Sequence, residues 1–209
     1  MKLFYAETFN NRKACAVARY LELPVTYVHV DLGKGEQRSP EFLAINPNGR
    51  VPALVDGDMT LWESDAIMCH LARKAGSELW PNDGAQQIEV MRWLSWNAQH
   101  FSRHTGTLYF EYLIKPHIGM GPTDTATVEE ATHFFRRNAA VLDAHLRDRS
   151  AVAGDDLTVA DFALATGLPY AEAAHIPLAE FPNIARWHAG LAALPAWRDP
   201  YPARQPAAA

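Results

Sequence analysis

The chain has 209 residues, which is enough for one large domain or two modest ones. Its formal net charge of −5 argues against a general nucleic-acid binder. No long apolar run follows Met1, and no stretch of about 18 apolar residues occurs anywhere. We therefore expect a cytoplasmic protein with no signal peptide, no membrane span and no nucleic-acid partner.

The first 75 or so residues predict alternating strands and helices. In chain order we expect a strand at 2–5, a helix at 11–22, a strand at 25–31, a short helix at 40–45, a hairpin turning at Asp56-Gly57, and a helix at 64–75. An Asp-Gly pair between two apolar runs is a strong signal for a two-residue hairpin turn. The order βαβαββα is the thioredoxin arrangement and indicates a mixed sheet covered by helices.

The remaining residues predict only helices. The stretch 76–85 contains Pro, Asn, Asp and Gly in succession and is typical of a linker. A long apolar-periodic helix then runs from about 86 to 114 and is expected to stop at Pro116. Thr127 to Glu130 predicts a capping box that opens the next helix, and Thr158 to Asp161 predicts a second box, flanked by a hydrophobic staple.

These elements define an α+β protein of two domains. The expected divisions are a thioredoxin-like domain at 1–77, a linker at 78–86, and an all-α helical bundle at 87–209. Cys15 and Cys69 lie inside helix patterns, far apart, with neither a CxxC motif nor a metal quartet. We expect a reducing compartment and no metal.

Two runs in the first domain carry the chemistry. In Asn46-Pro47-Asn48-Gly49-Arg50-Val51-Pro52, a loop ends at a Val-Pro step before an apolar strand, and the proline holds Val51 extended so that its peptide groups are free to pair. In Trp62-Glu63-Ser64-Asp65, an acid, a hydroxyl and a second acid stand where a strand gives way to a helix. Backbone amides at that helix start, together with Ser64, can hold a carboxylate. Each run alone is also typical of an ordinary hairpin or helix cap. Together they indicate a binding site for a small zwitterionic peptide.

Together the two runs resemble the glutathione-binding half of the cytosolic glutathione S-transferase superfamily. That family carries this Val-Pro step in cis and this Glu-Ser pair, and it carries the box at 158–161 at the start of its central helix, so the resemblance covers nearly the whole chain. It implies glutathione as cosubstrate, with Glu63 meeting the γ-glutamyl ammonium and Ser64 the carboxylate. Val51 and Pro52 would hold the peptide part, and Asp65 is expected mainly as a helix-start charge.

The resemblance also implies a hydrogen-bond donor for the glutathione thiol. A thiol of pKa about 8.5 needs roughly 2.7 kcal/mol of selective stabilisation to bring its pKa down by two. Transferases with a serine donor place it four residues before a basic residue, where this chain has Thr8. Thr8-Phe9-Asn10 also resembles the Thr-x-Asn pattern of the bacterial nu class, a nu- or theta-like motif, so Thr8 and Asn10 are the catalytic candidates. Both residue types are equally good N-caps, which is the alternative interpretation.

Other candidates for the donor fit less well. The basic turn places Ala6 where tyrosine-type classes have their tyrosine, so we expect Tyr5 in the core. Cys15 lies too deep in the helix for a cysteine-type class. Gln37, Arg38 and Arg50 are expected near the glycine end of the tripeptide, with solvated surface positions as the alternative.

A band of aromatic residues in the long helix is the expected place for a hydrophobic electrophile. From it, with Phe9 of the first domain, we select Trp96, His100 and His104 as pocket residues. Packing in the core or at a dimer interface is the alternative, since aromatic residues at helical spacing usually pack. His100 and His104 also have the i, i+4 spacing of a metal pair, but no third ligand is in view.

The sequence therefore predicts a cytoplasmic transferase of the detoxification type that activates glutathione and conjugates it to an electrophile, and the family suggests a homodimer. A glutathione-dependent disulfide or peroxide reductase on the same site is the first alternative. The second is a non-catalytic binding module that keeps the fold.

Overall fold

The structure is a computed structural model that describes residues 1–203, and it divides into two compact units. The first unit contains Met1–Gly76 together with the segment that begins at Ala193, and the second contains Ser77–Ala192. The division after Gly76 falls at the start of the predicted linker. We describe each unit separately.

The first unit has the thioredoxin order that was predicted. Its elements are β1 (Lys2–Tyr5), α1 (Phe9–Tyr20), β2 (Thr26–His29), the 3-10 turn η1 (Glu36–Arg38), α2 (Pro40–Leu43), β3 (Ala53–Asp56), β4 (Met59–Trp62) and α3 (Ser64–Ala75). The strands form one mixed sheet in the order β2-β1-β3-β4, in which β1 is parallel to β2 and antiparallel to β3. The α+β fold class is confirmed.

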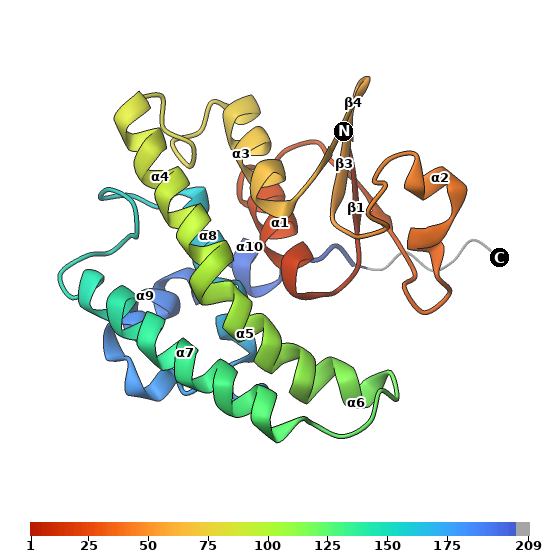
Figure 1. The fold of residues 1–209 in the computed structure, drawn as a ribbon. Helices are drawn as coiled ribbons and strands as arrows, with labels where there is room; N and C mark the ends of the chain where they lie inside the picture. Colours follow the sequence, from red (N-terminus) through yellow and green to blue (C-terminus); the bar gives the residue numbers. More distant parts are fainter. Residues whose placement is uncertain (204–209) are drawn as a thin grey trace. The chain divides into compact units, whose positions relative to one another are not determined.

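Helices cover both faces of this sheet. The neighbouring residues Ala53 and Leu54 of β3 point to opposite faces, and neither is exposed to solvent. α1 and α3 pack together on one side of the strands, and α2 lies on the other side (Figure 1). On the α2 side, Phe4 and Phe42 make an edge-to-face ring contact with centroids 5.8 Å apart.

The C-terminal segment packs against α1 of the first unit. It contains α10 (Pro195–Arg198), and the Arg12 guanidinium donates to the Trp197 carbonyl at 2.6 Å and lies 5.1 Å from the centre of the Trp197 ring. The Tyr201 hydroxyl donates to the Thr8 carbonyl at 3.0 Å. Residues 193–203 were expected to belong to the second domain, and these contacts explain the difference.

The second unit is helical. Its elements are α4 (Gly84–Trp96), a π-helical turn η2 (Asn97–Phe101), α5 (Ser102–Tyr109), a second π-helical turn η3 (Phe110–Ile114), α6 (Lys115–His117), α7 (Thr125–His145), α8 (Val159–Leu164), the 3-10 turns η4 (Ala165–Tyr170) and η5 (Leu178–Glu180), and α9 (Pro182–Ala192). The predicted long helix continues one residue past Pro116, to His117. We identified no sequence pattern that predicts its two π-helical turns.

The two predicted capping boxes had different outcomes. The box at the start of α8 is confirmed, because the Thr158 side chain accepts a helix N–H while Asp161 accepts the Thr158 N–H at 2.8 Å. The box at Thr127 is wrong. α7 begins after Asp124, whose carboxylate accepts the Thr127 N–H at 3.0 Å.

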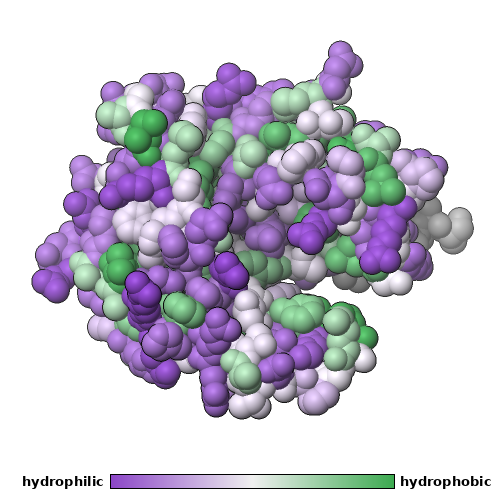
Figure 2. Space-filling view, in the orientation of Figure 1, coloured by the Kyte–Doolittle hydropathy of each residue, from purple (hydrophilic) through white to green (hydrophobic). Residues whose placement is uncertain are grey.

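No helix in the described residues is long and apolar enough to cross a membrane. On the face drawn in Figure 2, hydrophobic residues form small groups separated by hydrophilic ones. Scattered exposed apolar side chains of this kind are normal for a folded chain and do not by themselves indicate a binding surface.

Candidate functional site

The loop before β3, the junction between β4 and α3, and the first turn of α1 converge on one small cavity of the first unit. The cavity has a volume of about 110 Å³, and its lining residues are Asn10, Asn46, Asn48, Arg50, Val51, Pro52, Glu63 and Ser64. Six of these were predicted as site residues from motifs that lie up to 54 positions apart in the chain. The structure thus places the Val-Pro run, the Glu-Ser run and Asn10, in the first turn of α1, around a common space.

The loop before β3 is fixed by two asparagines that sequence reasoning did not select. Asn46 is 2% exposed and donates from its side-chain amide to the Arg50 carbonyl at 2.6 Å. The backbone and side chain of Asn48 both donate to the Asn46 amide oxygen, at 3.1 and 2.9 Å. Asparagine is common in turns, so the residue type at these two positions indicates a turn rather than a binding site.

The Val51–Pro52 peptide bond is cis, as the family resemblance implied. Pairing between β3 and β1 begins at Ala53, so the peptide groups of Val51 lie just outside the sheet ladder. A backbone N–H and C=O beside a cavity can bind the peptide group of a ligand in the way a neighbouring strand would.

The strand-to-helix junction at Glu63 and Ser64 is strained. Glu63 has φ of 69° and ψ of 116°, a conformation that is costly for a residue other than glycine, on the order of 1–3 kcal/mol. This turn presents the first residues of α3 to the cavity, where unpaired helix N–H groups favour an anion. Ser64 is 7% exposed, and its hydroxyl makes no hydrogen bond to any described residue.

An ion pair between a buried lysine and a half-buried aspartate joins the starts of α1 and α3. Lys13 is 4% exposed, and its Nζ atom lies 2.5 Å from Oδ1 of Asp65. Asp65 itself is outside the cavity lining. The pair fixes the spacing between the loop that carries Thr8 and the turn that carries Ser64.

Thr8 occupies the N-cap position of α1 but does not use its side chain as a cap. Its backbone is extended, with φ of −131° and ψ of 168°, and its hydroxyl accepts no helix N–H. The hydroxyl oxygen instead accepts a hydrogen bond from the Asn11 side-chain amide at 2.6 Å. The interpretation of Thr8 as a side-chain cap is therefore wrong, whereas Asn10 is exposed and lines the cavity.

Not every predicted site residue reaches this cavity. Thr8, Phe9, Gln37 and Arg38 are absent from its lining. Phe9 is buried, with 9% exposure, and Gln37 and Arg38 lie in the 3-10 turn before α2. The amide oxygen of Gln37 is buried without a partner among the described residues.

Both cysteines lie outside the cavity and are held as thiols. Cys15 is fully buried, and burial raises its pKa above the ordinary range. Burial, assisted by the nearby Asp65 charge, raises the pKa of Cys69 to about 12. Neither thiol has the lowered pKa that a cysteine nucleophile needs.

Three predicted residues of the second unit, Trp96, His100 and His104, lie along a groove of about 660 Å³. The groove is completed by Gln99, Arg103, Glu130, Phe134, Arg137, Asn138 and Val141. His104 stacks on Phe134 with ring centroids 5.2 Å apart, and burial lowers the pKa of His104 below its ordinary value. Within residues 1–203, no group of three or more metal-ligating side chains comes together.

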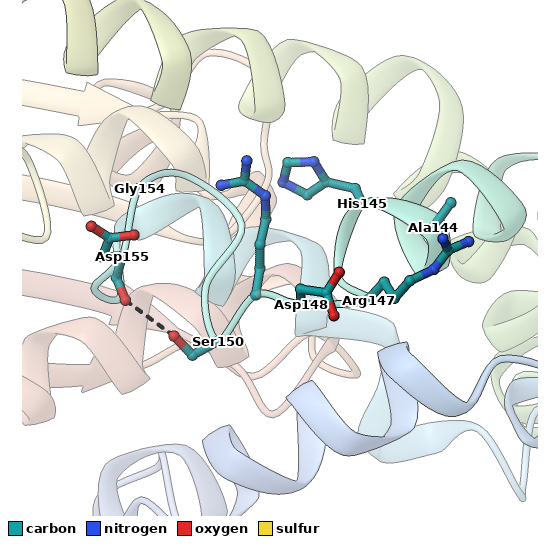
Figure 3. Close-up of a pocket in the computed structure, with 8 residues that line it drawn as sticks. Ala144, His145, Arg147, Asp148, Ser150, Gly154 and Asp155 are labelled. Carbon is teal, nitrogen blue, oxygen red and sulfur yellow. Dashed lines mark hydrogen bonds between the residues drawn. The ribbon is translucent and has the colours of Figure 1, made fainter.

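A separate cavity of about 520 Å³ lies where α7 ends (Figure 3). Its lining is mostly polar and includes His145, Arg147, Asp148 and Asp155, with the Ser150 hydroxyl donating to the Asp155 carbonyl at 3.2 Å. None of the predicted site residues lies in this cavity, and we assign it no role in the chemistry.

Comparison with known proteins agrees with the geometry of the first unit. Residues 1–73 match the family model of the glutathione S-transferase N-terminal domain, and residues 105–195 match that of the C-terminal domain. The chain is 38% identical to glutathione S-transferase 3 of Zea mays over 82% of this chain and 79% of the relative. It is 32% identical to glutathione S-transferase F10 of Arabidopsis thaliana, over 93% and 94% of the two chains.

Solved structures give the same result. Glutathione S-transferase I bound with lactoylglutathione superposes with a TM-score of 0.87 at 29% identity, covering 95% of this chain and 97% of that one. A family member from Pseudomonas fluorescens with two glutathione molecules bound superposes with a TM-score of 0.84 at 26% identity, covering 95% and 91%. The chain belongs to the glutathione S-transferase family.

Proposed function

We propose that this glutathione transferase binds glutathione in the cavity of the first unit and activates its thiol from the Thr8 loop. The observation that carries the proposal is the convergence of Asn10, Val51, Glu63 and Ser64 on one cavity. The Glu63 carboxylate receives the ammonium of the γ-glutamyl end, and Ser64 with the α3 N-terminus receives its carboxylate. The peptide groups of Val51 pair with the cysteinyl backbone.

Next to these residues, Arg50 is the proposed partner of the glycine carboxylate; the support for this role is that Arg50 lines the cavity and that its guanidinium is always charged. Gln37 and Arg38 lie on the neighbouring turn and extend this end of the site. Pro52 shapes the wall beside Val51. The tripeptide would therefore lie across the cavity, with its sulfur toward the loop before α1.

Thr8 and Asn10 are the proposed thiolate donors. Hydrogen bonds to a charged group stabilise by about 1.5–3 kcal/mol, which is comparable to the stabilisation that ionising the thiol at neutral pH requires. The sulfur then attacks the electrophilic carbon, a C–S bond forms, and the leaving group departs with its electron pair. The motif supports a nu-like mode of activation on a fold shared with plant transferases.

For the groove on the second unit we propose contact with a second copy of this chain rather than with the electrophile. Its lining combines aromatic side chains with charges of both signs, from Arg103, Glu130 and Arg137, which is the anatomy of a protein interface. Small-molecule pockets are mostly apolar with few polar groups. Phe134→Glu should shift the protein from dimer to monomer in sedimentation velocity, whereas Ile88→Glu, at an exposed position outside the groove, should not.

A disulfide or peroxide reductase is the second candidate. Both protein cysteines lie outside the cavity, so such a reaction would use the thiolate of one glutathione to form a disulfide with a second, while the substrate is reduced. The Thr-Phe-Asn motif supports this chemistry equally well. We also propose a cytoplasmic location, in line with two unpaired cysteines.

The test compares two assays on the same preparations. Conjugation of glutathione to an aromatic halide and glutathione-dependent reduction of a small disulfide are measured for the wild type, Thr8→Val and Asn10→Ala. We expect the wild type to catalyse conjugation, and the conjugation rate to fall at least tenfold in one or both variants. Reduction without conjugation would select the reductase, and absence of both activities would favour a non-catalytic module.

A further inference from the structure

Every backbone polar group of Thr8 is engaged. Its N–H donates to the Ala6 carbonyl at 2.8 Å. Its carbonyl accepts the N–H groups of Asn11 and Arg12 at 3.1 and 3.2 Å, and the Tyr201 hydroxyl at 3.0 Å. The backbone of this loop is therefore fixed, and only the side chain remains to interact with a ligand.

The Thr8 hydroxyl is itself held on one side. Asn11 donates from its amide nitrogen to Oγ1 at 2.6 Å, so the hydroxyl oxygen acts as acceptor in this contact. No described residue accepts the hydroxyl proton in return. A hydroxyl that already accepts one hydrogen bond is polarised and becomes a stronger donor.

Asn11 makes this contact at an energetic cost. It is completely buried, and its amide oxygen has no partner among the described residues. A buried polar atom without a partner costs about 1–3 kcal/mol. The reverse orientation of the amide would satisfy that oxygen with the Thr8 proton, but would remove the proton from any ligand.

We propose that Asn11 is a positioning residue for thiol activation. By donating to Oγ1 of Thr8, it prevents the hydroxyl from donating inward and directs the proton toward the sulfur of bound glutathione. This role rests on the proposed function of Thr8 and extends it. Asn11 does not touch the substrate, so its effect must pass through Thr8.

The experiment is a double-mutant cycle on the full chain with bound glutathione as the probe. The variants are Asn11→Leu and Thr8→Val, which remove the polar groups with little change in volume, and the double variant. For each, the pKa of the bound thiol is measured from the ultraviolet absorbance of the thiolate as a function of pH. KM for glutathione and kcat are measured on the same samples.

If Asn11 acts through Thr8, Asn11→Leu raises the thiol pKa by about 1, which is a tenfold smaller thiolate fraction at a pH below both values. KM for glutathione stays within about twofold, and the double variant has the same pKa as Thr8→Val. The control Asn82→Leu, at an exposed position in the second unit, leaves the pKa unchanged.

Two results would overturn the inference while leaving the role of Thr8 intact. In the first, the pKa of the bound thiol is unchanged in Asn11→Leu but raised in Thr8→Val. In the second, the thiol pKa of the double variant is raised by the sum of the two single shifts. An unchanged pKa in Thr8→Val would instead overturn the proposed function of Thr8 and, with it, the role of Asn11. Should Asn11→Leu fail to fold, Asn11→Ala takes its place, since it also removes the amide that donates to Thr8, adds no charge and is expected to raise the pKa.

Discussion

The role of Ser64 gives a prediction whose size follows from the structure. Ser64 lines the cavity at the first position of α3, and its hydroxyl has no hydrogen-bond partner in the described chain, so a ligand carboxylate is the partner we propose. A hydrogen bond to a charged group contributes about 1.5–3 kcal/mol. Because each 1.4 kcal/mol is tenfold in affinity, Ser64→Ala should raise the Kd for glutathione by about 10- to 150-fold.

Isothermal titration calorimetry with glutathione measures this Kd directly. The matched control is Ser95→Ala, which removes the same hydroxyl from an exposed position on α4 and should leave the Kd unchanged. Circular dichroism before each titration confirms that the variants are folded. A Kd for Ser64→Ala within twofold of wild type would refute the placement of the γ-glutamyl carboxylate at this residue.

Three further predictions concern the scaffold. Asp161→Ala should lower the free energy of unfolding by at least about 3 kcal/mol in urea titrations, because the N–H groups of Val152 and Thr158 and the Trp187 indole lose their buried acceptor; a loss below 1 kcal/mol would contradict this. Hydrogen bonds from the Asp124 N–H and Lys115 hold the pKa of Glu111 below its usual range, so their stabilisation is present above the unfolded pKa and is lost as pH falls through the folded pKa. Glu111→Gln should therefore have a lower urea midpoint than wild type at pH 7, with the gap between the two midpoints narrowing as the pH falls below 4.5, and a gap that does not change with pH would refute the linkage. Tyr201→Phe removes the donor to the Thr8 carbonyl and should cost about 0.5–1.5 kcal/mol of unfolding free energy, whereas an unchanged midpoint would show that the contact contributes nothing.

Local patterns predicted the parts of this fold that depend on local interactions. The hairpin between β3 and β4 and the box from Thr158 to Asp161 each rest on residues within a few positions of one another, and both are present in the structure, although the two turn residues of the hairpin are Gly57 and Asp58 rather than the predicted Asp56 and Gly57. The Glu-Ser pair and the Val-Pro step could likewise be recognised because each occupies a short run. Their convergence on one cavity follows from the sheet order, which the βαβ and ββα pattern already implied.

Contacts between distant residues decided the rest. The predicted cap was Thr127, whereas the observed cap is Asp124, three residues earlier, whose N–H donates to the Glu111 carboxylate at 2.8 Å. The packing of the C-terminal segment on α1 depends on Arg12, which donates to a carbonyl 185 residues away. Neither contact can be predicted from the periodicity of the sequence, because each joins residues that are far apart in the chain.

The asparagines of the site were missed for a related reason. Asn46 and Asn48 fit a turn, and Asn11 fits a helix start, so their types suggested no role in binding. Burial distinguishes them, because Asn11 and Asn46 are 0% and 2% exposed. A buried amide within a loop or first helical turn next to a predicted donor is the signal that would have identified them, and burial is not readable from one sequence.

The most direct test of the account is titration of the purified protein with glutathione at neutral pH, with calorimetry and ultraviolet difference absorbance recorded in parallel. We predict saturable binding accompanied by thiolate absorbance for the wild type, and binding without the thiolate signal for Thr8→Val. Absence of binding, or binding of glutathione only as the protonated thiol, would contradict the claim that this cavity holds and activates glutathione.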